Sequence, residues 1–281
     1  MMRSLIVSSS PHVRGPESVH RIMWFVTLSL LPAGIAGIFI FGIGALEVIA
    51  LGVISAVATE FVIQRMFKQK ITAFDGSAVL TGLLLAYNLP PHVPFWIPVI
   101  GSFFAIAIGK QVFGGLGQNI FNPALVGRVF CMASWPKYMT TFTAPFRYDA
   151  VTQATPLMRL KEGTALIGTN YPDLFLGNRG GCIGEVCVIA LIAGAAFLFM
   201  RGYISWHIPL SYLGTTAVIT WIFGSGNLFG GDWLFHVLSG GLILGAFFMA
   251  TDYVTSPLTA RGKIIFGIGE CHHEALCENS Y

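Results

Sequence analysis

Charged residues are scarce in this sequence. Only 10% of its 281 residues are Asp, Glu, Lys or Arg, whereas 54% are hydrophobic, and the mean hydropathy is +0.72. A soluble chain carries roughly 25% charged residues, so this chain has too few polar groups to cover a water-facing surface. The composition excludes a soluble enzyme, a disordered chain and a nucleic-acid-binding protein. It indicates a polytopic membrane protein whose first partner is the lipid bilayer.

Net charge and cysteine are also low. The net charge of +3 is too small and too scattered to indicate an anionic partner. The five cysteines are odd in number and lack a paired short spacing, which argues against a disulfide framework. The Cys/His/Glu-rich stretch 270–281 has adjacent histidines that cannot easily face one metal ion, so we expect no metal site. We interpret it as an atypical tail, and we favour a frameshift or sequencing error over a natural end.

Apolar runs predict the transmembrane helices. A helix needs about 20 residues to cross the hydrocarbon core. Eight runs approach or reach this length, and a ninth begins at Lys263 and stops at Gly269. The eight runs are 22–42, 46–64, 76–89, 95–109, 115–134, 183–200, 207–223 and 234–250.

Two short stretches resemble each other. Leu80–Asn88 (LTGLLLAYN) is similar to Ile243–Thr251 (ILGAFFMAT), and a Pro-containing turn and a new apolar run follow each. Five spans precede the polar segment 137–181, so the second half enters the membrane with inverted topology. Such repeats place binding sites near the midplane, at the ends of interrupted helices. We predict an all-α polytopic fold of two inverted-topology repeats of about five transmembrane helices each, the second incomplete here.

Lysine and arginine predict the orientation. With the N-terminus in the cytoplasm, ten basic residues lie in inner segments and five in the loop 137–181. The loop is therefore expected outside. The chain divides into a cytoplasmic N-terminal segment, a first repeat, the extracytoplasmic loop, an incomplete second repeat and the atypical tail. These parts are 1–21, 22–136, 137–181, 182–269 and 270–281.

The loop 137–181 is the only long polar stretch, and it contains the string DAVTQATPL from Asp149 to Leu157. Small and hydroxyl residues before a proline favour an extended, exposed backbone. The hydroxyl of Thr155 is then accessible to a modifying enzyme and can form a phosphoester. By itself this string is typical of a Thr-rich loop.

The pattern Asp-x-x-[Ser/Thr]-x-Ala-Thr resembles the flavinylation motif of the NqrB/RnfD membrane family, in which the last Thr is esterified to the phosphate of FMN. Further strings of this family follow in order, and the chain length and short N-terminus are similar to the RnfD branch. These strings are SPH (10–12), DGSAVLTG (75–82), NIFNPA (119–124), GCIGE (181–185) and TDYVTSPLT (251–259).

The resemblance implies FMN bound covalently to Thr155. Asp149, Thr152, Gln153 and Ala154 would shape recognition by a flavin transferase and the surroundings of the flavin. The resemblance also leaves room for a second, non-covalent flavin such as riboflavin.

The implied function is that of an integral-membrane electron-transfer subunit in an ion-translocating ferredoxin:NAD oxidoreductase, which couples electron flow to Na⁺ or H⁺ transport. Expected partners are the other membrane and peripheral subunits of an Rnf-type complex, including a flavin-bearing extracytoplasmic protein and Fe–S subunits. The expected location is a bacterial or archaeal cytoplasmic (inner) membrane. We expect no complete active site in this chain alone, because no nucleotide-binding or Fe–S ligand pattern occurs in it.

Two alternatives stay open at this point. One is a subunit of the related Na⁺-translocating NADH:quinone oxidoreductase. The other is a non-redox transporter or channel of the same inverted-repeat fold, which explains the helices but not the string from Asp149 to Leu157.

Charged residues in the membrane plane are candidates for an ion path. A charge at a helix centre costs about 2.5–3.5 kcal/mol, so it needs a partner or a water-filled cavity. Glu185 and Asp252 each adjoin a segment broken by Gly or Pro. We expect them on an ion path or paired with Lys110 or Arg128. Most other such charges, Glu60 included, are interpreted as interfacial residues or helix caps.

Overall fold

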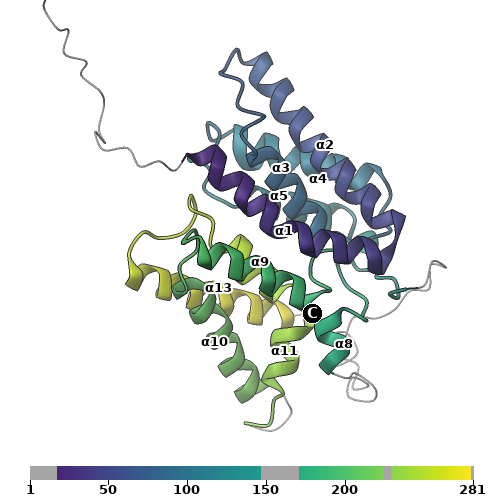
Figure 1. Ribbon diagram of the computed structural model, residues 1–281, viewed down its shortest axis with the longest axis vertical. Coiled ribbons are helices and arrows are strands. Elements are labelled where there is room, and N and C mark those ends of the chain that lie inside the picture. The colour runs from purple at the N-terminus through teal and green to yellow at the C-terminus, as the bar shows by residue number, and fades with distance from the viewer. Residues whose placement is uncertain (1–17, 147–170, 225–228, 280–281) are drawn as a thin grey trace, which may run out of the picture.

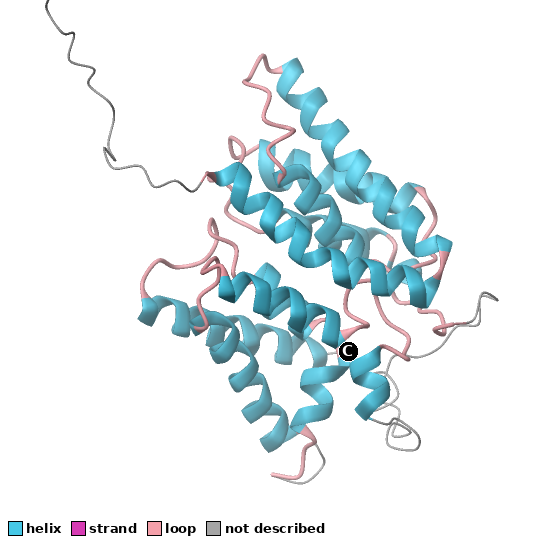
Figure 2. Ribbon diagram, in the orientation of Figure 1, coloured by secondary structure: helices cyan, strands magenta, loops and turns pink. Residues whose placement is uncertain are grey.

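The computed structural model describes residues 18–146, 171–224 and 229–279, with side chains as far as residue 270. These residues form helices joined by loops, and no β-strand occurs among them (Figure 2). The predicted all-α fold is confirmed. The inverted relation of the two repeats stays a prediction.

The first half contains two long helices and four shorter ones among the described residues. Ser18 accepts a hydrogen bond from the N–H of Arg21 and so caps the first helix. A tight turn at Gly42, with φ of +75°, separates the two long helices, and both are long and apolar enough to cross a membrane. The elements are α1 (Val19–Phe41), α2 (Ile43–Met66), α3 (Ser77–Tyr87), α4 (Trp96–Ile106) with its π-helical continuation η1 (Ala107–Gln111), α5 (Pro123–Ser134) and α6 (Pro136–Met139).

The second half has shorter helices, one of which is interrupted. Residues Gly240 and Gly241 separate two helical pieces of the predicted run 234–250, and the second piece continues as a π-helix. The elements are α8 (Tyr171–Leu176), α9 (Val188–Met200), α10 (His207–Phe223), α11 (Trp233–Ser239), α12 (Leu242–Leu244), η2 (Gly245–Met249) and α13 (Ala260–Asn279).

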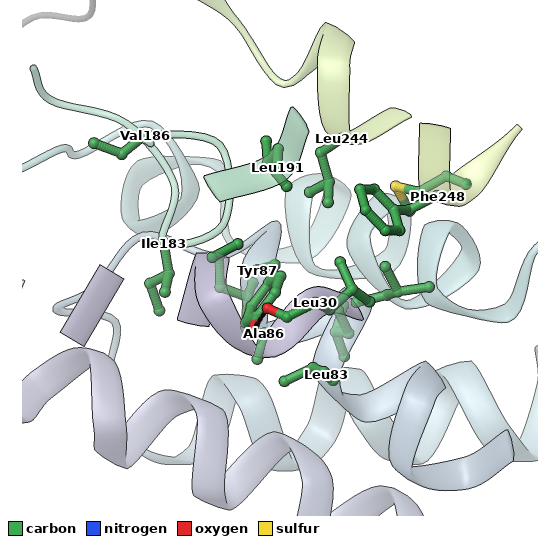
Figure 3. Packing of buried hydrophobic residues seen from close by; sticks show 14 of the residues in the cluster. Leu30, Leu83, Ala86, Tyr87, Ile183, Val186, Leu191, Leu244 and Phe248 are labelled. Atoms are coloured by element: carbon green, nitrogen blue, oxygen red, sulfur yellow. Dashed lines mark hydrogen bonds between the residues drawn. The ribbon is translucent and has the colours of Figure 1, made fainter. Parts of the chain in front are cut away.

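The helices form two groups that meet along α1 and α9 (Figure 1). Small residues allow this close contact, as in other membrane helix pairs. A Cβ atom at Gly194 of α9 would lie 2.1 Å from the carbonyl oxygen of Ser29 in α1. Tyr87 is fully buried where the groups meet, and its hydroxyl donates to the carbonyl of Leu30 at 2.8 Å (Figure 3).

The two opposite ends of the bundle are identified by residues of α1. At the Arg21 end lie the start of α3, where Gly76 contacts Trp24, and Tyr203, whose ring centroid is 5.6 Å from that of Phe25. At the Ile40 end, the Ile40 carbonyl accepts from the N–H of Phe146 at 3.0 Å. Residues 177–186 also reach this end, since Gly177 contacts Ile40 and Val186.

Three predicted helix boundaries differ from those observed. The predicted run 115–134 becomes helical only at Pro123, because Gly114, Gly115 and Gly117 adopt positive φ angles. The predicted run 183–200 begins as a loop and becomes α9 at Val188. The last helix does not stop where its apolar run stops, at Gly269, but continues to Asn279.

Candidate functional site: a cavity between the two halves

The predicted flavin-binding residues lie outside the described residues. This applies to Asp149, Thr152, Gln153, Ala154 and Thr155. The described residues on both sides of this segment lie at the Ile40 end. Phe146 precedes the segment and bonds to Ile40, and the stretch from Tyr171 onward follows it and reaches Ile40 through Gly177. The candidate loop therefore leaves and re-enters the described structure at one end of the bundle.

Two side chains connect the chain after this loop to α11. The Tyr171 hydroxyl donates to the carboxylate of Asp232 at the start of α11, and this hydrogen bond raises the pKa of Tyr171. The buried Arg179 donates to the carbonyls of Leu238 and Glu185. Burial lowers the pKa of Arg179, and the nearby Glu185 carboxylate opposes this effect. The return of the loop is thus attached to the interrupted helix.

Glu185 lies at the Ile40 end, in the loop before α9. Its Oε1 accepts the N–H of Cys182 at 2.8 Å. Its Oε2 faces the helix break, since a Cβ atom at Gly241 would lie 2.7 Å from it. Among the described residues Glu185 makes no ion pair with Lys110 or Arg128, so the expected pairing with either is wrong. Its neighbouring cation is Arg179.

A cavity of about 70 Å³ lies between the two halves, towards the Arg21 end. This is room for several water molecules. Its walls combine apolar side chains, including Phe247 and Phe248 of η2, with polar ones from both halves. The polar lining residues are Ser77, Thr81, Lys110, Asn119, Asn122, Thr251 and Asp252. The Oδ1 atom of Asn119 is buried and has no hydrogen-bond partner among the described residues.

Of the two predicted ion-path residues, Asp252 lines this cavity and Glu185 does not. It is half-buried and accepts the N–H of Val254 at 3.4 Å. Asp252 and Glu185 therefore belong to opposite ends of the bundle and are not brought together.

A buried ion pair borders the cavity. The ammonium of Lys110 in η1 lies 2.8 and 2.7 Å from the two carboxylate oxygens of Glu60 in α2, and 2.6 Å from the hydroxyl of Ser77. Lys110 is 1% exposed and Glu60 is 0% exposed. The amides of Gln64 and Gln111 also donate to Glu60. Neither residue caps a helix among the described residues, so the cap interpretation is wrong for this pair.

Sequence patterns do not reveal this pair. A membrane-embedded charge needs a partner, so the sequence indicates that Glu60 pairs with a cation. It does not indicate which cation. The two residues are 50 positions apart, and the π-helical turn of η1 determines where Lys110 points. Such turns occur frequently at functional sites.

Polar contacts at the end of α3 join the two halves through Met249. Arg128 of α5 donates to the side-chain oxygen of Asn88, which follows α3. The amide of Asn88 donates to the Leu84 carbonyl at 2.7 Å and lies 3.4 Å from the sulfur of Met249. Asn122 in turn donates to the Met249 carbonyl at 3.4 Å. The two segments with similar sequences thus meet at Asn88 and Met249.

Comparison with known proteins decides the family. The model of the NQR2, RnfD, RnfE family matches residues 6–273 of this chain. The chain belongs to this family. The resemblance inferred from the flavinylation string and the accompanying motifs is confirmed.

Family members with assigned names are similar over nearly the whole chain. The D subunit of the proton-translocating ferredoxin:NAD(+) oxidoreductase complex of Clostridium ljungdahlii is 51% identical over 94% of this chain and 83% of its own length. The D subunit of the Na(+)-translocating ferredoxin:NAD(+) oxidoreductase complex of Acetobacterium woodii is 51% identical over 95% and 82%. The D subunit of the ion-translocating oxidoreductase complex of Methanosarcina acetivorans is 37% identical over 95% and 83%.

Proposed function

We propose that this family member is the D-type membrane subunit of an ion-translocating ferredoxin:NAD⁺ oxidoreductase. The observation that carries the proposal is 51% identity to two such subunits across at least 94% of the chain. The chain would pass electrons within the complex and couple their flow to ion movement. The two relatives are equally similar to this chain, but one is named as proton-translocating and the other as Na⁺-translocating. The proposal therefore includes both Na⁺ and H⁺ as the transported ion.

The proposed redox cofactor is FMN, esterified through its phosphate to Thr155. FMN supplies the redox chemistry when bound, and the chain supplies the tether and the position. Asp149, Thr152, Gln153 and Ala154 would present Thr155 to the flavin transferase. The structural support is that the described residues on both sides of this segment lie at one end of the bundle, beyond the membrane helices.

A second, non-covalent flavin such as riboflavin is proposed on the family resemblance alone, because a cavity with room for several water molecules is too small to hold a flavin ring.

Asp252 and Glu185 are proposed to take part in ion movement at the two ends of the bundle. Asp252 offers a carboxylate beside a cavity with room for water, which is where an intramembrane charge is tolerated. Glu185 offers one beside the helix break at Gly240-Gly241.

The proposed location is the cytoplasmic membrane of a bacterium or archaeon, with the N-terminus and the Arg21 end inside and the Ile40 end outside. The partners would be the remaining membrane and peripheral subunits, among them Fe–S proteins and a flavin-bearing protein at the outer face. The charge distribution supports this orientation, because ten basic residues lie on the inner side and five on the outer side.

One experiment separates the redox subunit from a plain transporter of the same fold. The complex is denatured and run on a gel, and the band of this chain is viewed under ultraviolet light. Flavin fluorescence at that band is expected, because a phosphoester survives denaturation. A dark band from an assembled, flavin-supplied complex would favour the transporter.

A further inference from the structure

A continuous chain of hydrogen bonds runs from the start of α3 to the buried ion pair. Lys110 donates to the hydroxyl of Ser77 at 2.6 Å, and this hydroxyl in turn donates to Oδ1 of Asp75. Lys110 also donates to both carboxylate oxygens of Glu60. The four side chains therefore form one uninterrupted series of polar atoms, in the order Asp75, Ser77, Lys110 and Glu60.

Exposure to solvent falls step by step along this series. Asp75 is half-buried, in the loop that precedes α3 at the Arg21 end, and its carboxylate has access to water. The three side chains after it are almost completely buried, with exposed fractions of 3% for Ser77, 1% for Lys110 and 0% for Glu60. The series thus connects water at the Arg21 end with a carboxylate that water does not reach directly.

Ser77 gives this connection the chemistry to carry a proton. A hydroxyl can accept a proton on a lone pair while it gives up its own proton, and Ser77 both accepts from Lys110 and donates to Asp75. The other described side chains bonded to Glu60 are the amides of Gln64 and Gln111. An amide nitrogen donates but does not accept, so these two residues hold Glu60 in place without relaying a proton.

We propose that Asp75 and Ser77 are a proton relay that loads and unloads the Lys110–Glu60 pair from the Arg21 end. In the unloading step, one proton moves from the Lys110 ammonium to Oγ of Ser77 while the hydroxyl proton of Ser77 moves to the Asp75 carboxylate. The products are a neutral Lys110 amine, an intact Ser77 hydroxyl and a protonated Asp75, which releases its proton to water. Loading is the same step in reverse.

Unloading changes the charge that the pair presents to the cavity, which Lys110 and Ser77 both line. The ammonium and the carboxylate together are neutral, whereas the neutral amine leaves one negative charge on Glu60. A charge inside the membrane needs a counter-charge, so a monovalent cation that enters the cavity stabilises the unloaded pair. The relay thereby couples proton release at the Arg21 end to cation uptake into the cavity, and this role rests on the proposed function in ion translocation.

The test uses the assembled complex in liposomes, supplied with reduced ferredoxin and NAD⁺. NADH formation and ion movement, followed with radioactive Na⁺ and a pH-sensitive dye, are measured for wild type, Asp75→Asn, Ser77→Ala, Ser77→Thr and Thr81→Ala. Asp75→Asn keeps an acceptor oxygen for the N–H and hydroxyl of Ser77 but cannot take up a proton. Thr81→Ala is the matched control, because the Thr81 hydroxyl also belongs to α3 and lines the cavity but donates to the Ser77 carbonyl, outside the relay.

The ion flux should fall about a hundredfold for Asp75→Asn and Ser77→Ala, which is the lower end of what a positioned proton-transfer group contributes. Ser77→Thr restores the hydroxyl and should keep most of the flux, and Thr81→Ala should behave like wild type. The loss in Asp75→Asn is the result that a purely structural role does not explain, because asparagine caps a helix as well as aspartate does.

Wild-type ion flux in Asp75→Asn and Ser77→Ala complexes with normal flavin and subunit content would overturn the relay and leave Asp75 as a cap of α3 only. An equal loss in Thr81→Ala would also overturn it, since the flux would then depend on any hydroxyl of this cavity wall. Should Ser77→Ala not assemble, Asp75→Asn decides. Failure of the proposed function has a different signature, because the wild-type complex itself would then move no ions while it forms NADH.

Discussion

Glu60 and Lys110 are two charged side chains that the interior of this protein accommodates only as a pair. Each is at most 1% exposed, and an isolated ion at such a position has a large desolvation cost. Three protein groups donate to the Glu60 carboxylate, namely Lys110, Gln64 and Gln111. The pair presents a neutral surface to the cavity, which leaves Asp252 as the charged group there.

Removing one partner of this pair should be more damaging than removing both. Glu60→Gln leaves Lys110 buried without its counter-ion, and we expect a loss of about 3–5 kcal/mol in the free energy of unfolding. In Glu60→Gln/Lys110→Met both charges are gone, so part of the loss should be recovered. Thermal unfolding of the detergent-solubilised chain measures this. A double variant less stable than the single one would contradict the pairing.

Thr155→Ala should abolish the covalent flavin and leave membrane insertion unchanged, because only the acceptor of the phosphoester is lost. Fluorescence of the denatured band is the measurement. Thr152→Ala is the matched control, since it removes a hydroxyl from the same string but not the proposed acceptor, and it should keep the label. If Thr152→Ala alone loses the flavin, the acceptor has been assigned to the wrong residue.

At the scale of elements, the packing of α3 against the loop 182–185 joins the two halves. Gly184 is required there, since a Cβ atom at this position would lie 2.3 Å from the Cβ of Tyr87. The sequence predicts α3 as a short helix, because Asp75-Gly76 and Pro90-Pro91 bound its apolar run. It does not predict the loop, because Ile183, Val186 and Cys187 continue the apolar run of the helix that follows them. Contact with the end of α3 holds them out of the helix.

Gly184→Ala should therefore destabilise the protein by about 1–3 kcal/mol, the usual effect of forcing an extra methyl group into a packed site. Gly214→Ala in α10 is the control, since nothing lies within 4 Å of its added Cβ and alanine favours a helix. The difference in unfolding temperature between the two variants is the measurement. Equal stability of both would show that the loop adapts easily and does not lock the halves.

At the scale of the whole molecule, the two halves lie against each other so that one cavity has walls from both. The Arg21 end contains this cavity, and the Ile40 end holds both flanks of the candidate flavin loop. The proposed inner and outer sites thus lie at opposite ends of the bundle.

Surface labelling tests which end faces outward. With the native cysteines replaced, Thr141→Cys should react with a membrane-impermeant thiol reagent in intact cells, since Thr141 is exposed beside the Ile40 end. Thr143→Cys is the negative control, because Thr143 is only 4% exposed. Labelling of Thr141→Cys only after cell lysis would reverse the proposed orientation.

The sequence by itself determined the membrane environment, the all-α class, most helix positions and the family. These depend on composition and on local strings such as NIFNPA (119–124), which persist wherever the chain folds. The tertiary structure decided which charges meet. Glu60 found Lys110, and Arg128 found Asn88, because the π-helical turn of η1 and the packing of α3 against α5 aim these side chains. Partners 40 to 50 residues apart are selected by packing geometry, and no local pattern encodes that selection.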